Sequence, residues 1–161
     1  MKKLFKTIHF DQSDSHVYDR AAENDEWAIS GAFAFHNATP DSLAGKPKQA
    51  FTNGFLSLGT FGRSTFTSVA EVSDDDLEEL QLTLAKHFHE HYGAPSVYAG
   101  KQAANVELEF AQSVCEEQPI NTVFTVKRFF DDEEKIREEY RIVTPPQGPV
   151  HARVWDIVED E

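Results

Sequence analysis

The clearest pattern of hydrophobic and polar positions runs from Ser73 to Glu117 and predicts two helices in succession. Ser73 is a good N-cap, and the acidic residues that follow it suit the positive end of a helix dipole. A break follows at Gly93 and Pro95, where glycine ends one helix and proline starts another. One face of the first helix carries an apolar stripe of Leu77, Leu80, Leu84 and Phe88.

The second helix is expected from Pro95 to about Glu117, and it is apolar over most of its circumference. At the standard angle per residue, polar side chains gather on one narrow face. Glu107 is the exception, because the winding places its carboxylate in the middle of the apolar arc. We therefore expect the second helix to be the more buried of the two.

The rest of the chain alternates with the two-residue period of β-strands. Two strands near the C-terminus are joined by an acidic turn at 131–135. The stretch 37–48 contains two prolines and a glycine and is expected to be a surface loop, with an Ω-loop or lid as the alternative. The expected strands are 4–10, 16–18, 27–35, a hairpin over 51–72 that reverses near 61–64, 122–130, 136–144 and an edge strand at 150–158.

These elements predict an α+β fold in which a bent antiparallel sheet carries a central two-helix hairpin packed on one face. Its length of 161 residues suits one domain, so we expect 1–161 to be a single α+β domain. Thirteen phenylalanines against one methionine predict a stiff aromatic core.

The formal net charge of −13 repels nucleic-acid phosphates and anionic lipids, so neither nucleic acid nor a membrane is an expected partner. One cysteine excludes an intrachain disulfide and favours a reducing compartment. His9 and Asp11 interrupt the basic start before the apolar core of a signal peptide forms. We therefore expect a cytoplasmic protein.

Three histidines near the end of the first helix are candidates for metal binding. His87 and His91 are four residues apart and share one side of the helix, which suits a zinc ion. His89 points the other way and no further ligands complete the pattern. Cationic side chains near a helix C-terminus are also favoured by the dipole, so we predict no metal and keep His87 and His91 as candidate ligand-binding residues.

Glu107 needs a partner, because an unpaired carboxylate inside an apolar arc is costly or takes up a proton. Arg63 and Arg128 on the predicted sheet are the leading candidates, because arginine binds a carboxylate bidentately. Such a centre would either be a structural ion pair or fix a small anionic or amide ligand. Cys115 is expected to be buried, and its acidic neighbours make it a poor nucleophile.

Two segments, 26–35 and 54–65, resemble a small bacterial family catalogued only as a domain of unknown function. The similarity extends through the His-Tyr-Gly-Ala-Pro break at 91–95. The resemblance implies a small bacterial cytoplasmic protein, and it implies no activity, cofactor or site.

Two functions are compatible with these observations. The first is a non-catalytic cytoplasmic accessory or binding protein that needs no cofactor and self-associates as a homodimer through aromatic surface left uncovered by the helices. The alternative is a small-molecule-binding domain or enzyme, with a pocket between helix pair and sheet centred on Glu107 and an arginine. The sequence does not decide whether the protein is an enzyme.

Overall fold

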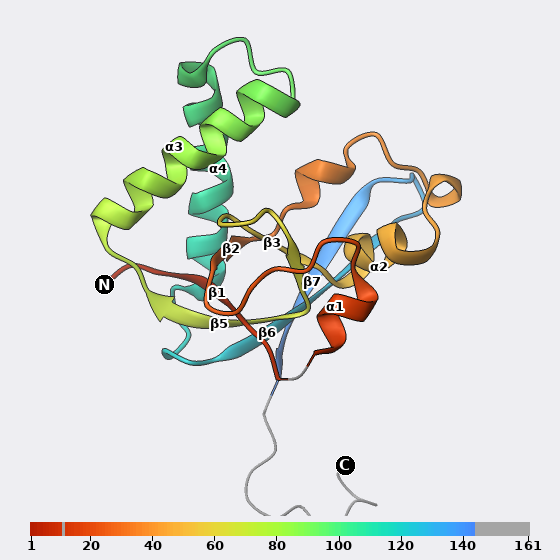
Figure 1. The fold of residues 1–161 in the computed structure, drawn as a ribbon, viewed down its shortest axis with the longest axis horizontal. Helices are drawn as coiled ribbons and strands as arrows, with labels where there is room; N and C mark the ends of the chain where they lie inside the picture. The colour runs from red at the N-terminus through yellow and green to blue at the C-terminus, as the bar shows by residue number, and fades with distance from the viewer. Residues whose placement is uncertain (11, 144–161) are drawn as a thin grey trace, which may run out of the picture.

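A computed structural model describes residues 1–10 and 12–143 of the chain. Its centre is a curled antiparallel sheet, in which seven strands of the described region run in the order β4-β3-β2-β1-β5-β6-β7 (Figure 1). The strands are β1 (Lys3–Ile8), β2 (Trp27–Ile29), β3 (Phe55–Ser57), β4 (Arg63–Ser64), β5 (Phe66–Glu71), β6 (Val123–Phe130) and β7 (Ile136–Val143). The predicted bent antiparallel sheet is confirmed.

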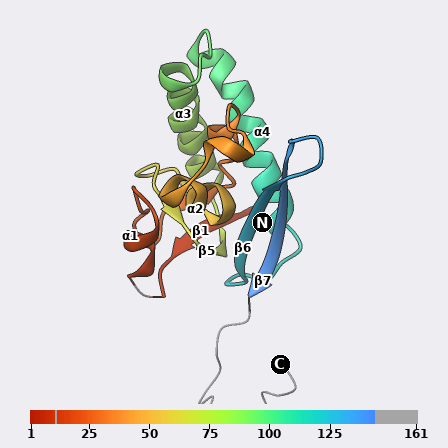
Figure 2. The same cartoon turned by 90° about the vertical axis from the view of Figure 1, so that its right-hand side faces the viewer.

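Two long helices, α3 (Asp74–His91) and α4 (Val97–Cys115), form the predicted hairpin. The Ser73 hydroxyl accepts a hydrogen bond from the Asp76 amide at 3.0 Å, and the Ser96 hydroxyl accepts one from the Ala99 amide at 3.1 Å. Gly93 takes a left-handed φ of 78°, as a glycine after a helix end does. Figure 2 shows the pair standing together above one part of the sheet.

The core lies between α4 and the middle of the sheet. α4 buries a narrow stripe of small and apolar side chains against β1 and β2, which is how the hairpin covers one face. Phe5 of β1 is fully buried and contacts the rings of Phe55, Phe124 and Tyr140. The prediction of an aromatic core is therefore correct.

The segment 27–35 is only partly a strand, contrary to the prediction. β2 ends at Ile29, and Gly31 then adopts a left-handed φ of 77°. An added Cβ at Gly31 would come within 2.4 Å of the Leu56 Cβ, so the backbone approaches β3 too closely for another residue. The chain leaves the sheet at this glycine and forms the 3₁₀ helix η1 (Ala32–Phe35).

Two further expectations about local structure are wrong. The predicted strand at 16–18 lies mostly in a short helix, α1 (Ser13–Val17), and the expected loop at 37–48 contains η2 (Pro40–Ser42) and the start of α2 (Gly45–Asn53). Pro47 lies in the first turn of α2, where a missing amide hydrogen costs nothing. These short helices have little pattern of their own to reveal them.

The predicted hairpin over 51–72 is also shorter than expected. Only β3 and β4 pair across the turn at 58–62, while β5 pairs with β1 and β6 instead. The hairpin of β6 and β7 has the predicted turn at 131–135. The predicted edge strand at 150–158 lies outside the described residues, and in the described part of the chain no helix has the length and hydropathy to cross a membrane.

Candidate functional site

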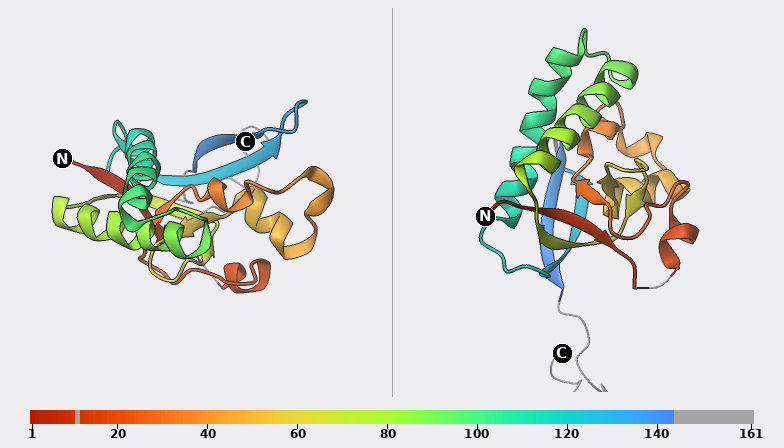
Figure 3. Two further views of the ribbon diagram at one scale, coloured as in Figure 1. Left: turned by 90° about the horizontal axis from the view of Figure 1, so that it is seen from above. Right: turned by 60° about the vertical axis from the view of Figure 1, so that its left-hand side comes forward.

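A groove of about 440 Å³ lies between α2 and the final residues of β6. Seen from above, α2 and the turn after β6 lie at one end of the molecule and the helix pair at the other (Figure 3). The volume falls within the range of small-molecule sites. Its walls are mostly apolar, with lysines at the rim, and include Leu43, Lys48, Phe51, Lys127, Phe129 and Phe130.

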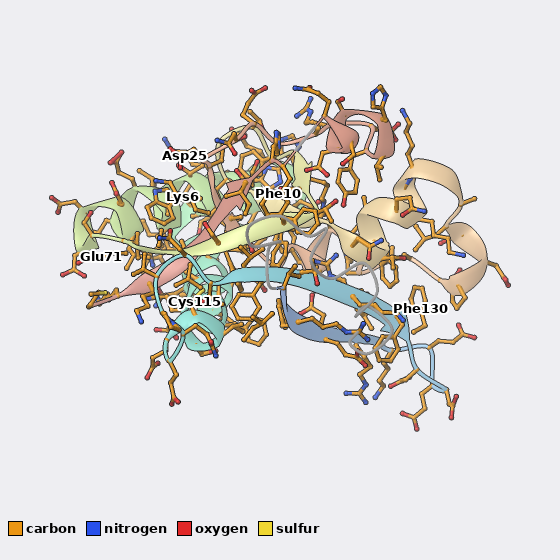
Figure 4. The ribbon with its side chains drawn as sticks, turned by 90° about the horizontal axis from the view of Figure 1, so that it is seen from below. Lys6, Phe10, Asp25, Glu71, Cys115 and Phe130 are labelled. Atoms are coloured by element: carbon orange, nitrogen blue, oxygen red, sulfur yellow. The ribbon has the colours of Figure 1, made fainter. Side chains whose placement is uncertain are left out.

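Consecutive residues at the end of β6, from both faces of the strand, line the groove. Val126 and Arg128 are buried, while Lys127 and Phe129 are exposed on the other side of the strand. Phe130 stacks on Phe51 of α2, with ring centroids 4.7 Å apart and planes 10° from parallel. Figure 4 shows Phe130 at the end of β6, well apart from Cys115 at the end of α4. The stacked rings fix α2 against the sheet and give the groove a rigid apolar wall.

The side chains of the two lysines that line the groove make no hydrogen bond or ion pair with another described residue. Both are exposed, and Glu139 of β7 stands directly opposite Lys127 in the sheet without pairing with it. The carboxylate of Asp131, by contrast, is fully engaged. It accepts bonds from the Glu133 and Lys135 amides and from Arg137 Nε at 2.7 Å. These bonds, the Lys135 amide first, lower the pKa of Asp131.

Arg128 lies beneath the groove, and its side chain is completely buried. Its Nε donates to Glu138 Oε2 at 2.7 Å, and Nη1 donates to the carbonyls of Phe51 at 2.7 Å and Ala50 at 3.3 Å. Nη2 donates to the carbonyl and hydroxyl oxygens of Ser30. A guanidinium has five N–H donors. All five are used here, so Arg128 joins the ends of α2 and β2 to β7 and keeps no donor for a ligand.

Glu138 completes this buried polar centre from β7. In addition to Arg128, its carboxylate accepts hydrogen bonds from the Ser30 hydroxyl and, at 2.9 Å, from the Tyr140 hydroxyl. Burial, followed by the nearby Glu138 charge, raises the pKa of Tyr140, so its hydroxyl keeps its proton. The network is a closed set of satisfied donors and acceptors, which gives it a structural role.

Sequence reasoning missed Glu138, although the sequence contains a signal for it. β6 and β7 flank a five-residue turn, and counting back from the turn pairs Phe130 with Ile136 and Arg128 with Glu138. Side chains on directly opposed residues point to the same face of a sheet. A carboxylate opposite a buried arginine was therefore foreseeable from the predicted hairpin alone.

Glu107 lies near this centre but does not pair with either predicted arginine in the described structure. Its side chain is partly buried, and burial followed by the charge of Glu138 raises its pKa. The charge in the buried polar centre that acts on Glu107 is therefore the carboxylate of Glu138, and not an arginine. Glu107 does not line the groove.

Arg63 is buried among backbone carbonyls rather than carboxylates. Nη1 donates to the Gly54 carbonyl at 3.1 Å and Nη2 to the Gly31 carbonyl at 3.2 Å, while the guanidinium lies 4.9 Å from the centroid of the Phe35 ring. Burial, and next the charge of Arg128, lowers its pKa to about 9. Arg63 therefore holds η1 and the start of β3 together.

The histidines lie apart from this centre. The His87 ring stacks on Phe61 with centroids 3.9 Å apart, and the His91 ring is 5.0 Å from that of His87. Burial, and then the neighbouring His91, lowers the pKa of His87. Among the described residues, no group of three or more His, Cys, Asp or Glu side chains could hold a metal ion.

Comparison with known proteins identifies a family. A family model described as "Family of unknown function (DUF6505)" matches residues 1–155. No curated protein and no solved structure matches the chain. The match covers both segments that carry the resemblance noted from the sequence.

Proposed function

The chain belongs to a family of unknown function, DUF6505, and on that premise we propose that it is a non-catalytic binding protein for a small organic anion. The ligand is an anion with a flat apolar body, and it occupies the groove between α2 and β6. The observation that carries this proposal is that two lysines whose side chains make no ion pair line an apolar groove in a chain of net charge −13.

The groove supports this ligand class through two features. The rings of Phe51, Phe129 and Phe130 offer apolar surface on which a flat ring can stack. Lys48 and Lys127 are free to meet a carboxylate or sulfonate at the rim. Elsewhere the acidic surface repels anions, so these two lysines favour this site over the rest of the molecule.

A binding role fits better than catalysis, because the strongest chemical groups are already engaged. The N–H donors of Arg128 are all used in hydrogen bonds within the protein. Cys115 is buried, and burial raises the pKa of its thiol to about 12, far from that of an activated nucleophile. Burial, followed by the charge of Glu138, raises the pKa of Glu107, yet Glu107 does not line the groove.

The proposal is tested by fluorine NMR with 4-(trifluoromethyl)benzoate and its neutral analogue 4-(trifluoromethyl)benzamide. The benzoate is expected to bind saturably and the benzamide more weakly. Lys48→Gln and Lys127→Gln should each weaken benzoate binding about 2- to 5-fold, the range for one exposed charge pair, and added salt should weaken it further.

Lys46→Gln is the matched control, because Lys46 is exposed on the same helix and does not line the groove. It should leave benzoate affinity unchanged. Equal loss of affinity in Lys46→Gln and Lys48→Gln would refute the assignment to this groove, and so would equal binding of benzoate and benzamide.

We also propose that the protein self-associates, with a second copy on the outer face of α4. Val106 is 64% exposed and Phe110 43%, and Ile142 of β7 adds a further apolar side chain that is 56% exposed. Lys101 precedes Asn105 by as many residues as Glu109 follows it. If two α4 helices pair antiparallel with Asn105 at the centre, Lys101 of each copy therefore meets Glu109 of the other. This complementarity favours a copy of the same chain as occupant.

Light scattering after size exclusion tests the dimer. A mass near twice 18.2 kDa is expected for the wild type, and Val106→Glu should give a single chain. Leu82→Glu is the control, since Leu82 is 38% exposed on α3 and outside the α4 face. A wild type that runs as a monomer at all concentrations would exclude this interface.

We further propose the cytoplasm as compartment, because the one cysteine is a free thiol.

A further inference from the structure

The groove between α2 and β6 can take a peptide segment as well as a small ligand. Its apolar wall includes the rings of Phe51, Phe129 and Phe130, and its volume of about 440 Å³ leaves room for one large aromatic side chain. The side chains of Lys48 and Lys127, which also line it, make no hydrogen bond or ion pair with another described residue. The groove therefore suits an occupant that combines an aromatic ring with negative charge.

The sequence after β7 contains a segment of this kind. The last described residue is Val143, and residues 144–161 follow it. Positions 154–161, which we call the acidic tail, read Val-Trp-Asp-Ile-Val-Glu-Asp-Glu. They combine one tryptophan and three aliphatic residues with four carboxylates and no cation. In a chain of net charge −13, most of the surface repels such a segment, and an apolar groove with two lysines attracts it.

The acidic tail is long enough to reach the groove. Val143 pairs with Val123 at one end of the hairpin of β6 and β7, whereas Phe130 pairs with Ile136 at the other end, where the groove lies. The eight residues of β7 span about 26 Å between these ends. The twelve residues from Val143 to Trp155 can extend to about 40 Å. The difference leaves enough chain to pass around the edge strand β7.

We propose that the acidic tail occupies the groove of its own chain, with the Trp155 indole on the aromatic wall and the tail carboxylates beside Lys48 and Lys127. This inference rests on the proposed anion site and gives it a regulatory element, because the tail and a free anion compete for the same groove. A short tether gives the tail an effective concentration in the millimolar range, so a weak contact is enough to fill the groove.

The first test compares amide spectra of ¹⁵N-labelled full-length wild type and Trp155→Ala in the absence of ligand. Amides in 43–52 and 127–131 are expected to differ, because the variant lacks the indole that contacts both sides of the groove. His151→Ala is the matched control, since it changes the same C-terminal region outside the acidic tail, and it should leave these amides in place. Groove amides that are unchanged in Trp155→Ala would overturn the proposal, and so would changes that gather elsewhere on the described fold.

A peptide added in trans tests the contact without relying on one variant. A synthetic peptide of residues 150–161 should return the groove amides of Trp155→Ala toward their wild-type positions in a saturable way. The same peptide with alanine at position 155 should not, and equal effects of the two peptides would contradict the indole contact.

Dilution of the wild type separates the tail of the same chain from the tail of a second copy. Groove amides that stay in place over the whole concentration range are expected for the same chain, whereas a shift on dilution would overturn that assignment.

A titration with 4-(trifluoromethyl)benzoate separates this inference from the proposed anion function. Trp155→Ala should bind benzoate about 2- to 10-fold more tightly than the wild type, because the competing tail is weakened. Equal affinity in both proteins would refute the regulatory role of the tail and leave the anion site in place. Benzoate that binds neither protein would refute the anion site, and the amide comparison then still confirms or refutes the docking of the tail.

Discussion

Replacing Glu138 by alanine is expected to destabilise the fold far more than the same change at the next residue. Glu138 Oε2 accepts from Arg128 Nε at 2.7 Å, and the exposed fractions of the two side chains are 15% and 0%. Glu139 pairs with Arg141 at 3.1 Å, with exposed fractions of 50% and 63%. The two glutamates are neighbours on β7 and point to opposite faces.

The structure sets the expected magnitudes. Glu138→Ala leaves the Arg128 charge buried without a counter-charge, and it removes the acceptor of the Tyr140 hydroxyl. Breaking a buried pair from one side costs about 3–5 kcal/mol in the free energy of unfolding. Glu139→Ala breaks an exposed pair, which is worth about 0–1 kcal/mol.

Urea unfolding followed by far-UV circular dichroism at 25 °C measures both costs. A domain of this size has a total free energy of unfolding of about 5–15 kcal/mol. Glu138→Ala should therefore lower the urea midpoint strongly. A measurable transition remains if the wild-type stability lies in the upper part of that range. Glu138→Gln retains an acceptor oxygen and should fall between the two alanine variants. A cost below about 1 kcal/mol for Glu138→Ala, or one equal to that of Glu139→Ala, would refute the buried ion pair.

Three further changes test other parts of the structure. Burial, followed by the charge of Glu138, raises the pKa of Glu107 in the folded protein. The contribution of Glu107 to the free energy of unfolding is therefore complete when the pH is below its pKa in the unfolded chain. That contribution is lost as the pH rises through its pKa in the folded protein. Glu107→Gln should therefore raise the melting temperature at pH 8 and leave it nearly unchanged at pH 4; a pH-independent effect would contradict the shift. The Cys115 thiol, whose pKa burial raises to about 12, should react with a disulfide reagent at pH 8 only after urea unfolds the protein. Gly100→Ala should lower stability by about 1–3 kcal/mol in urea unfolding, because the new Cβ would come within 2.5 Å of the Ala85 carbonyl where α3 and α4 touch. A neutral result would mean that the helices are not packed so closely.

The helical hairpin was predictable because its signals are local. Ser73 and Gly93 mark the two ends of α3, and each signal depends on the backbone conformation of one residue. The break at 93–95 also separates α3 from α4, although α4 begins at Val97 behind the N-cap Ser96, two residues later than the predicted start at Pro95. The hairpin of β6 and β7 was predictable for the same reason, because a short run of polar residues at 131–135 indicates its turn.

The other elements depend on contacts between distant segments. β2 stops at Gly31 because of its approach to Leu56, and no pattern within 27–35 reveals that neighbour. α2 packs its Phe51 on Phe130, a residue of β6, which stabilises a helix that propensity alone does not favour. The groove arises from this long-range pairing, so the sequence analysis did not locate it.

The binding site itself is tested most directly by mapping amide chemical shifts during a titration with 4-(trifluoromethyl)benzoate. We predict saturable shifts at amides in 43–52 and 127–131, the two sides of the groove. In the Lys48→Gln, Lys127→Gln double variant the same shifts should need markedly more ligand. Shifts that gather around Glu107 and α4 instead, or the absence of any saturable shift at millimolar ligand, would contradict a ligand site between α2 and β6.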